Sequence, residues 1–226
     1  MKLIKNKLIR ITKNGLEELG YREIKDTITP AQGLYIKLVE NDLYLTLGLT
    51  ISRYYDSMFT ASFYISKTTI WARYGGDIPK NSYQRIGNFL TTEERGILLN
   101  EEHSKEGVKD AWWNEKDEKA IKYFLETVRI TESRFLGQPD LFFNIQNSKD
   151  VNELDKLAKM VIDEVDSDNI NGYNYQFIPK KSIDDIPMDW FKTAERVIMA
   201  EKAILNINTV KALAADAWRQ TLVKRR

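Results

Sequence analysis

The sequence predicts an α+β fold, in which an antiparallel meander of four to five strands has helices packed on one face and a helical C-terminal part follows. Two runs of alternating apolar residues, at 43–51 and 59–65, carry this prediction. Side chains alternate across a strand, so each run has one apolar face and one mixed face. The short segment between the runs suits an antiparallel pair with a covered face. The second half of the chain has apolar residues at helical spacing instead.

The first half begins with a helix, because its apolar side chains follow a helical stripe that includes Ile4 and that Gly20 can end. Strands separated by turn residues follow it. The predicted elements of this half are a helix over 1–19 and strands over 21–28, 34–39, 43–51, 59–65 and 68–74. The segments 83–90 and 92–99 fit either short helical turns or edge strands.

The second half reads as a series of helices. A long helix starts at Trp113 or Asn114, and further helices begin near Asp150, near Pro187 and after Asn208. Strands followed by helices indicate α+β architecture. We expect an α+β domain over 1–165 and a helical extension packed on it over 166–226, or a single domain over 1–226.

Composition excludes several classes of protein. The chain has 226 residues, of which 42% are hydrophobic and 30% charged, with a net charge of +1. It has no cysteine, which excludes disulfides, cysteine-ligated metals and a cysteine nucleophile. The N-terminus lacks the continuous apolar segment of a signal peptide, and no run is long enough to span a membrane. We therefore expect a cytoplasmic protein without a membrane partner.

Motifs for catalysis or cofactors are missing from the sequence. There is no glycine-rich phosphate loop, and the single histidine, His103, lies in a charged segment where a solvated loop residue is expected. Paired carboxylates are common, but most fall on expected helix surfaces or helix starts. We therefore predict no catalytic residue, no metal ligand and no cofactor, and the sequence favours a non-enzymatic function.

Aromatic and arginine residues gather at predicted strand ends and ahead of the long helix. Tyrosine, tryptophan and arginine are common in protein interfaces, so these residues form a candidate binding surface. Its predicted members are Arg53, Tyr54, Tyr55, Arg73, Tyr74 and Trp112. Such a cluster also suits a phosphate or a nucleic-acid base.

The mixed face of the sheet allows two interpretations. Exposed, it would be an aromatic platform; covered by helices, it would be a second core, which the size of its aromatic residues favours. Its members are Tyr44, Thr46, Thr60, Tyr64 and Trp71.

Charge is distributed unevenly along the second half. Acidic residues outnumber basic ones over 150–168, and basic residues outnumber acidic ones over 180–226. These stretches are either solvated helix faces or surfaces that face each other within the fold or between subunits. A nucleic-acid interface is an alternative for the basic stretch. Its predicted contacts are Lys211, Arg219, Lys224, Arg225 and Arg226.

Three short motifs resemble a widespread bacterial domain family of unknown function. They are Leu19-Gly20-Tyr21 at the end of the first helix, Leu47-Gly48-Leu49 in the meander and Trp112-Trp113 ahead of the long helix. The resemblance covers roughly residues 1–165. It implies a compact α+β domain and no catalytic residue, and the family's polar residue after the second strand has no clear counterpart here.

These observations favour a non-enzymatic bacterial domain that binds another protein, as an immunity or adaptor protein does. The alternatives are a nucleic-acid-binding protein and a carboxylate-metal hydrolase. The sequence does not indicate an oligomeric state.

Overall fold

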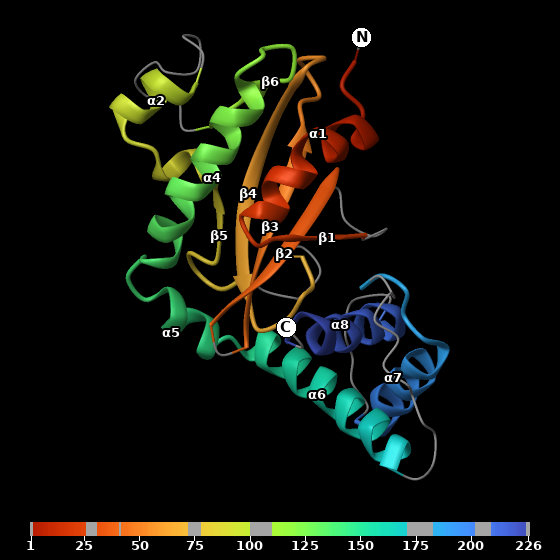
Figure 1. The fold of residues 1–226 in the computed structure, drawn as a ribbon. Helices are drawn as coiled ribbons and strands as arrows, with labels where there is room; N and C mark the ends of the chain where they lie inside the picture. Colours follow the sequence, from red (N-terminus) through yellow and green to blue (C-terminus); the bar gives the residue numbers. More distant parts are fainter. Residues whose placement is uncertain are drawn as a thin grey trace. The chain divides into compact units, whose positions relative to one another are not determined.

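A computed structural model of the chain describes residues 2–25, 31–40, 42–71, 78–99, 110–170, 183–201 and 209–224 (Figure 1). It confirms the α+β fold. The strands are β1 (Arg22–Ile24), β2 (Gly33–Glu40), β3 (Leu43–Ile51), β4 (Met58–Ser66), β5 (Tyr83–Arg85) and β6 (Trp113–Asn114). The helices are α1 (Lys5–Glu18), the 3-10 helix η1 (Ile86–Phe89), α2 (Thr92–Leu98), α4 (Ala120–Leu136), α5 (Leu141–Gln146), α6 (Lys149–Ile170), α7 (Met188–Ala200) and α8 (Thr209–Lys224).

The sheet is a meander, in which β1 to β5 are neighbours in chain order and β6 also pairs with β4. The fifth strand is β5, whose Tyr83 lies opposite Tyr64 in an antiparallel register. The strand predicted over 68–74 is wrong in its described part, 68–71. There the backbone N–H groups of Thr68 and Thr69 donate to side-chain oxygens of Ser66 and Asp216, rather than to a neighbouring strand.

The long helix starts later than the sequence predicts. Trp113 and Asn114 form β6, opposite Phe59 and Met58 of β4, and α4 begins at Ala120. Between them, the backbone N–H of residue 117 donates to the Asn114 carbonyl and closes a turn. Trp113 is nevertheless buried, so it contributes to the core from a strand instead of a helix.

The apolar face of the sheet packs against α1 and α4 (Figure 1). Phe59 and Phe63 of β4 contact Phe124 and Phe135 of α4, with 5.2 Å between ring centroids in each pair. The two helices also approach each other closely: a Cβ added to Gly15 of α1 would lie 2.2 Å from a methyl carbon of an α4 leucine. A glycine at this position therefore permits the helix crossing.

The mixed face is buried as well. Its aromatic and threonine side chains are at most 4% exposed, as are those of Ser62 and Ser66. This burial contradicts an exposed aromatic platform. The buried members are Tyr44, Thr46, Thr60, Tyr64 and Trp71.

The chain forms two compact units, each made of three stretches of sequence. The sheet unit comprises Met1–Lys37, Leu45–Ile65 and Pro79–Asn144. The helical unit comprises Leu38–Tyr44, Ser66–Ile78 and Ile145–Arg226. The boundary expected after residue 165 falls inside α6, all of which belongs to the helical unit.

Within the helical unit, α6, α7 and α8 pack pairwise around one apolar cluster. Trp190 of α7 meets Trp218 of α8 edge to face, with ring centroids 5.3 Å apart. Small residues of α8, among them Ala214 and Ala217, are fully buried and allow the other helices to come close.

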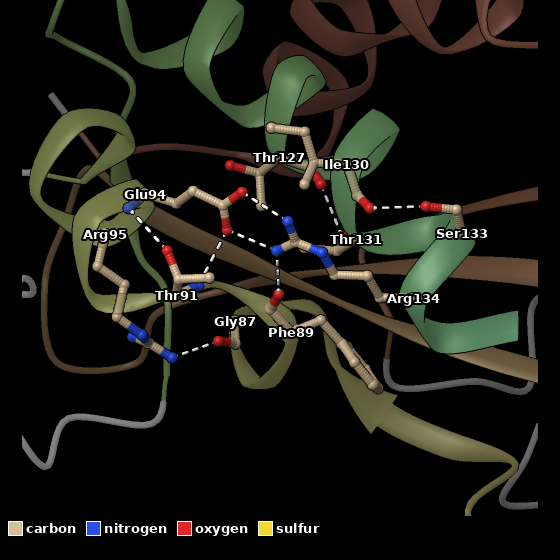
Figure 2. Close-up of polar contacts among 10 residues, drawn as sticks. All are labelled: Gly87, Phe89, Thr91, Glu94, Arg95, Thr127, Ile130, Thr131, Ser133 and Arg134. Atoms are coloured by element: carbon tan, nitrogen blue, oxygen red, sulfur yellow. Dashed lines mark hydrogen bonds and ion pairs between the residues drawn. The ribbon is translucent and has the colours of Figure 1, made fainter. Parts of the chain in front are cut away.

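An ion pair joins α2 to α4 in the sheet unit (Figure 2). Thr91 caps α2 with a capping box, in which its hydroxyl accepts from the Glu94 backbone and the Glu94 carboxylate accepts from the Thr91 backbone. The same carboxylate accepts from both Nη atoms of Arg134, at 2.5 and 2.7 Å. Arg134 also donates to the Phe89 carbonyl at 2.7 Å. The hydrogen bonds with Arg134 are the largest factor that lowers the Glu94 pKa to about 2.

We predict that the free energy of unfolding contains a coupling between Glu94 and Arg134, measurable in a double-mutant cycle of Glu94→Gln and Arg134→Gln. Both side chains are partly exposed, so solvent limits the coupling to about 1 kcal/mol at neutral pH. Because folding lowers the Glu94 pKa, this stability is present above about pH 4.5 and is lost as pH falls toward about 2.

The matched control is the pair Glu126 and Arg129, which lies on the surface of α4 alone. We expect a coupling below about 0.5 kcal/mol there, because the pair joins residues of a single helix. A Glu94–Arg134 coupling no larger than this control would contradict the role of the pair in holding α2.

Candidate functional site

The turn between β3 and β4 exposes two adjacent tyrosines. The Tyr54 side chain is 92% exposed and that of Tyr55 is 62% exposed, while Arg53 and Asp56 beside them are also exposed. The backbone of this turn is nevertheless held firmly. The buried Ser52 hydroxyl accepts from the N–H groups of Tyr54 and Tyr55, at 3.1 and 3.0 Å. The turn is therefore a defined structure that displays its aromatic rings.

The N-terminal residues lie against this turn. The Leu3 N–H donates to the Asp56 carbonyl at 2.6 Å, and the Leu3 side chain is buried. This anchor places Lys2 and Ile4 beside the turn, both exposed, and Ile4 is 59% exposed. The N-terminus and β6 lie at the same end of β4 (Figure 1). Lys5, the first residue of α1, follows Ile4 and is exposed too.

The hydrogen bond from Leu3 to Asp56 joins the two exposed segments, and we call their exposed residues the tyrosine patch. Among the described residues, none of its charged side chains forms an ion pair. By contrast, Lys7, two residues further along α1, pairs with Glu115 at 2.5 Å. The tyrosine patch consists of Lys2, Ile4, Lys5, Arg53, Tyr54, Tyr55 and Asp56.

The structure separates the residues predicted for a binding surface. Arg53, Tyr54 and Tyr55 share the turn. Trp112 directly precedes β6 and is half-buried, and the Arg85 guanidinium lies 6.0 Å from its ring centroid. Arg73 and Tyr74 lie outside the described residues.

Sequence reasoning missed the N-terminal part of the tyrosine patch. Ile4 was expected on the buried stripe of the first helix, yet it is the N-cap residue of α1 and points to solvent. The available signal was the spacing of lysines around Ile4, which breaks the apolar stripe at its start.

The basic residues proposed for nucleic acid have different surroundings. Arg219 is 5% exposed and lies 3.5 Å from the Asp184 carboxylate, and Lys224 contacts Asp42 at 2.7 Å. Lys211 is exposed. Arg225 and Arg226 lie outside the described residues, as does His103.

The acidic and basic stretches meet within the helical unit. Glu164 of α6 pairs with Arg196 of α7 at 3.4 Å, which is one of the arrangements that the charge pattern allowed. A pair of the opposite sense, Lys156 with Glu201, accompanies it at 2.8 Å. The helical unit thus uses part of its segregated charge internally.

The helical unit also contains a buried carboxylate. Asp216 of α8 is fully buried, and its Oδ1 accepts from the backbone N–H of Thr69 at 2.6 Å and from the Thr69 hydroxyl at 2.7 Å. Its Oδ2 accepts from Gln220 at 3.3 Å, and Gln220 also donates to the Lys67 carbonyl. Asp216 therefore fastens the segment after β4 to α8.

Other polar groups surround Asp216. The Tyr44 hydroxyl and one Asp155 oxygen are buried without a hydrogen-bond partner among the described residues. The other Asp155 oxygen accepts from Lys159 at 2.7 Å, which also faces Asp42. The Asp216 pKa is raised to about 6, chiefly by burial and to a smaller extent by Asp155, against the opposing effect of the hydrogen bonds from Thr69 and Gln220.

Asp216 in this cluster is closed to solvent. Asp216 has no exposed atom through which a substrate could reach it. Within the described ranges, no group of three or more acidic, histidine or cysteine residues is placed to hold a metal ion. No helix in those ranges is long and apolar enough to cross a membrane.

We predict that Asp216 makes the free energy of unfolding fall as pH rises from about 4 to about 6. The folded protein holds the Asp216 proton more tightly than the unfolded chain does, so the ionised group costs up to about 3 kcal/mol above about pH 7. Asp216→Asn is expected to remove this pH dependence, as measured by urea unfolding across that range.

The substitution keeps an oxygen that accepts from Thr69, and the amide of Gln220 can turn so that its unpartnered oxygen accepts from the new Asn amide. That turn gives up the 3.5 Å hydrogen bond from Gln220 to the Lys67 carbonyl, which lowers stability equally at every pH and leaves the pH slope as the readout. Asp163→Asn, which changes an exposed carboxylate of α6, is the matched control and should leave the slope unchanged. An Asp216→Asn protein with the wild-type slope would show that another group titrates.

Comparisons with known proteins add no second line of evidence. No protein-family model, curated protein or solved structure matches this chain. The resemblance to a bacterial domain family thus stays a prediction.

Proposed function

We propose that this chain is a non-enzymatic protein-binding domain, of the immunity or adaptor kind, that binds its partner through the tyrosine patch. One observation carries the proposal: Tyr54 and Tyr55 are 92% and 62% exposed on a turn whose backbone is fixed by Ser52. The fold itself does not require these rings, because both sheet faces are filled by other side chains.

Tyrosines on a fixed turn favour binding for an energetic reason. A tyrosine ring supplies a large amphipathic contact area while losing the freedom of few side-chain torsions. A turn that is already ordered adds little entropy cost when the complex forms. Arg53, beside the rings, belongs to another residue type that often dominates interface energetics.

Neither alternative has comparable support among the described residues. Two cations proposed for nucleic acid, Arg219 and Lys224, already face acidic side chains. The carboxylates expected for a metal hydrolase do not converge in the described ranges. Binding of another protein is therefore the function that the geometry supports best.

We predict that Tyr54→Ala/Tyr55→Ala weakens a specific complex by about 2 kcal/mol or more, roughly thirty-fold in Kd, without unfolding the protein. The wild-type and variant chains are immobilised in parallel and exposed to native bacterial lysate. Proteins retained by the wild type and lost by the variant are then purified, and their Kd is measured by calorimetry.

A matched control changes two other exposed apolar side chains of the sheet unit. Ile97 and Phe143 are 66% and 64% exposed, so Ile97→Ala/Phe143→Ala removes similar surface elsewhere. The control should retain the partner at near wild-type affinity. If the tyrosine variant retains every protein that the wild type retains, this function is rejected.

A further inference from the structure

We propose that the tyrosine patch recognises an acidic protein surface with an apolar centre. This inference rests on the proposed function and specifies the chemistry of the partner. The patch brings together three cationic side chains, one anionic side chain and three exposed apolar or aromatic ones, all within two short segments. These segments are 2–5 and 53–56, joined by the hydrogen bond from Leu3 to Asp56.

The tyrosine patch has more positive than negative charge among the described residues. Lys2, Lys5 and Arg53 form no ion pair among the described residues, and Asp56 is the patch's own single acid. The first turn of α1 has no acidic residue and no side-chain cap, so the positive end of the helix dipole adds to this charge. Carboxylates on a partner would offset both.

Lys7 lies close to the patch in sequence but, unlike the patch cations, has an acidic partner among the described residues. Lys7 lies on the same helix, and its ammonium is paired with Glu115, which is almost fully buried. In the part of the chain that the structure describes, Lys7 thus has an acidic partner, whereas Lys2, Lys5 and Arg53 form no ion pair. A carboxylate of the partner protein would give these cations the kind of pairing that Lys7 has within the fold.

The apolar part of the patch favours a protein over a nucleic acid or a membrane. Ile4 is aliphatic and offers no ring for a base to stack on. Membrane binding by an amphipathic helix needs a long apolar face, whereas the apolar face of α1 is buried in the fold. A protein surface can pack apolar side chains against an isoleucine and two tyrosines and can also place charged groups opposite those of the patch.

The two halves of the patch should act at different stages of binding. Exposed cations steer an acidic partner during encounter, so they raise the association rate at low salt. The tyrosines and Ile4 become desolvated in the complex, so they determine how slowly it dissociates.

The test uses a displayed library of random peptides of about twelve residues, selected on the immobilised full-length chain. Peptides that also bind Tyr54→Ala/Tyr55→Ala are removed by counter-selection. A random single-stranded RNA pool and vesicles of phosphatidylglycerol and phosphatidylcholine are tested against the same two chains. We expect the enriched peptides to be acidic and to carry apolar or aromatic residues between their acids.

One enriched peptide is then measured against charge-reversal variants. Arg53→Glu should weaken its binding about ten-fold or more, and the remaining affinity should fall less steeply with salt. Lys80→Glu is the matched control, because Lys80 is exposed, unpaired among the described residues and located near the opposite end of β4. Its affinity should stay within about two-fold of the wild type.

The outcomes separate this inference from the proposed function. Enrichment of neutral or basic peptides that need the tyrosines would overturn the acidic partner and leave protein binding intact. Enrichment of RNA or retention of vesicles, without peptide enrichment, would overturn both. A selection that yields no tyrosine-dependent ligand of any class also counts against the acidic partner, since the excess positive charge of the patch would then attract nothing.

Discussion

The fold depends on the complete burial of β4, whose nine residues are all shielded from solvent. A strand in this position must be covered on both faces, so its neighbours are constrained by it. On one face, Phe59 and Phe63 require the aromatic side chains of α4. On the other face lie buried polar residues such as Thr60 and Ser62. Burying a polar group costs free energy unless it finds a hydrogen-bond partner, and the cost depends on the size and charge of the group. A buried hydroxyl costs less free energy than a buried charged group, so threonine and serine suit this face better than charged residues.

The sequence predicts those parts of the fold that have a period. Apolar residues alternate over nine residues in β3 and over seven, 59–65, in β4, and α7 carries a strong apolar stripe. By contrast, β5 and β6 have three and two residues, which is too short for alternation to be detected. They form because the edge of β4 has backbone N–H and C=O groups left over, with which the segments around Tyr83 and Trp113 form ladder hydrogen bonds. Such strands are consequences of tertiary structure and have no local signal.

The same reasoning explains which part of the candidate site was predictable. Tyr54 and Tyr55 fall between two alternating runs, so a turn with exposed rings follows from the sequence alone. The contribution of Lys2 and Ile4 depends on a single contact between segments far apart in the chain, from Leu3 to the turn. Asp216 was equally hidden, because α8 is buried around most of its circumference and its charge pattern resembles that of a surface helix.

Burial of both sheet faces also limits where this protein can bind anything. A face that is filled by other side chains cannot receive a partner, and the short edge strands offer few free backbone groups for strand addition. Among the parts of the sheet, the loops at the ends of the strands remain open to a partner, and loops normally need a separate source of rigidity. The turn after β3 obtains it from Ser52, whose buried hydroxyl holds Tyr54 and Tyr55. That turn also joins the two longest strands, so both of its ends are fixed by the buried core. The backbone that carries the two exposed rings is therefore held in place from both sides.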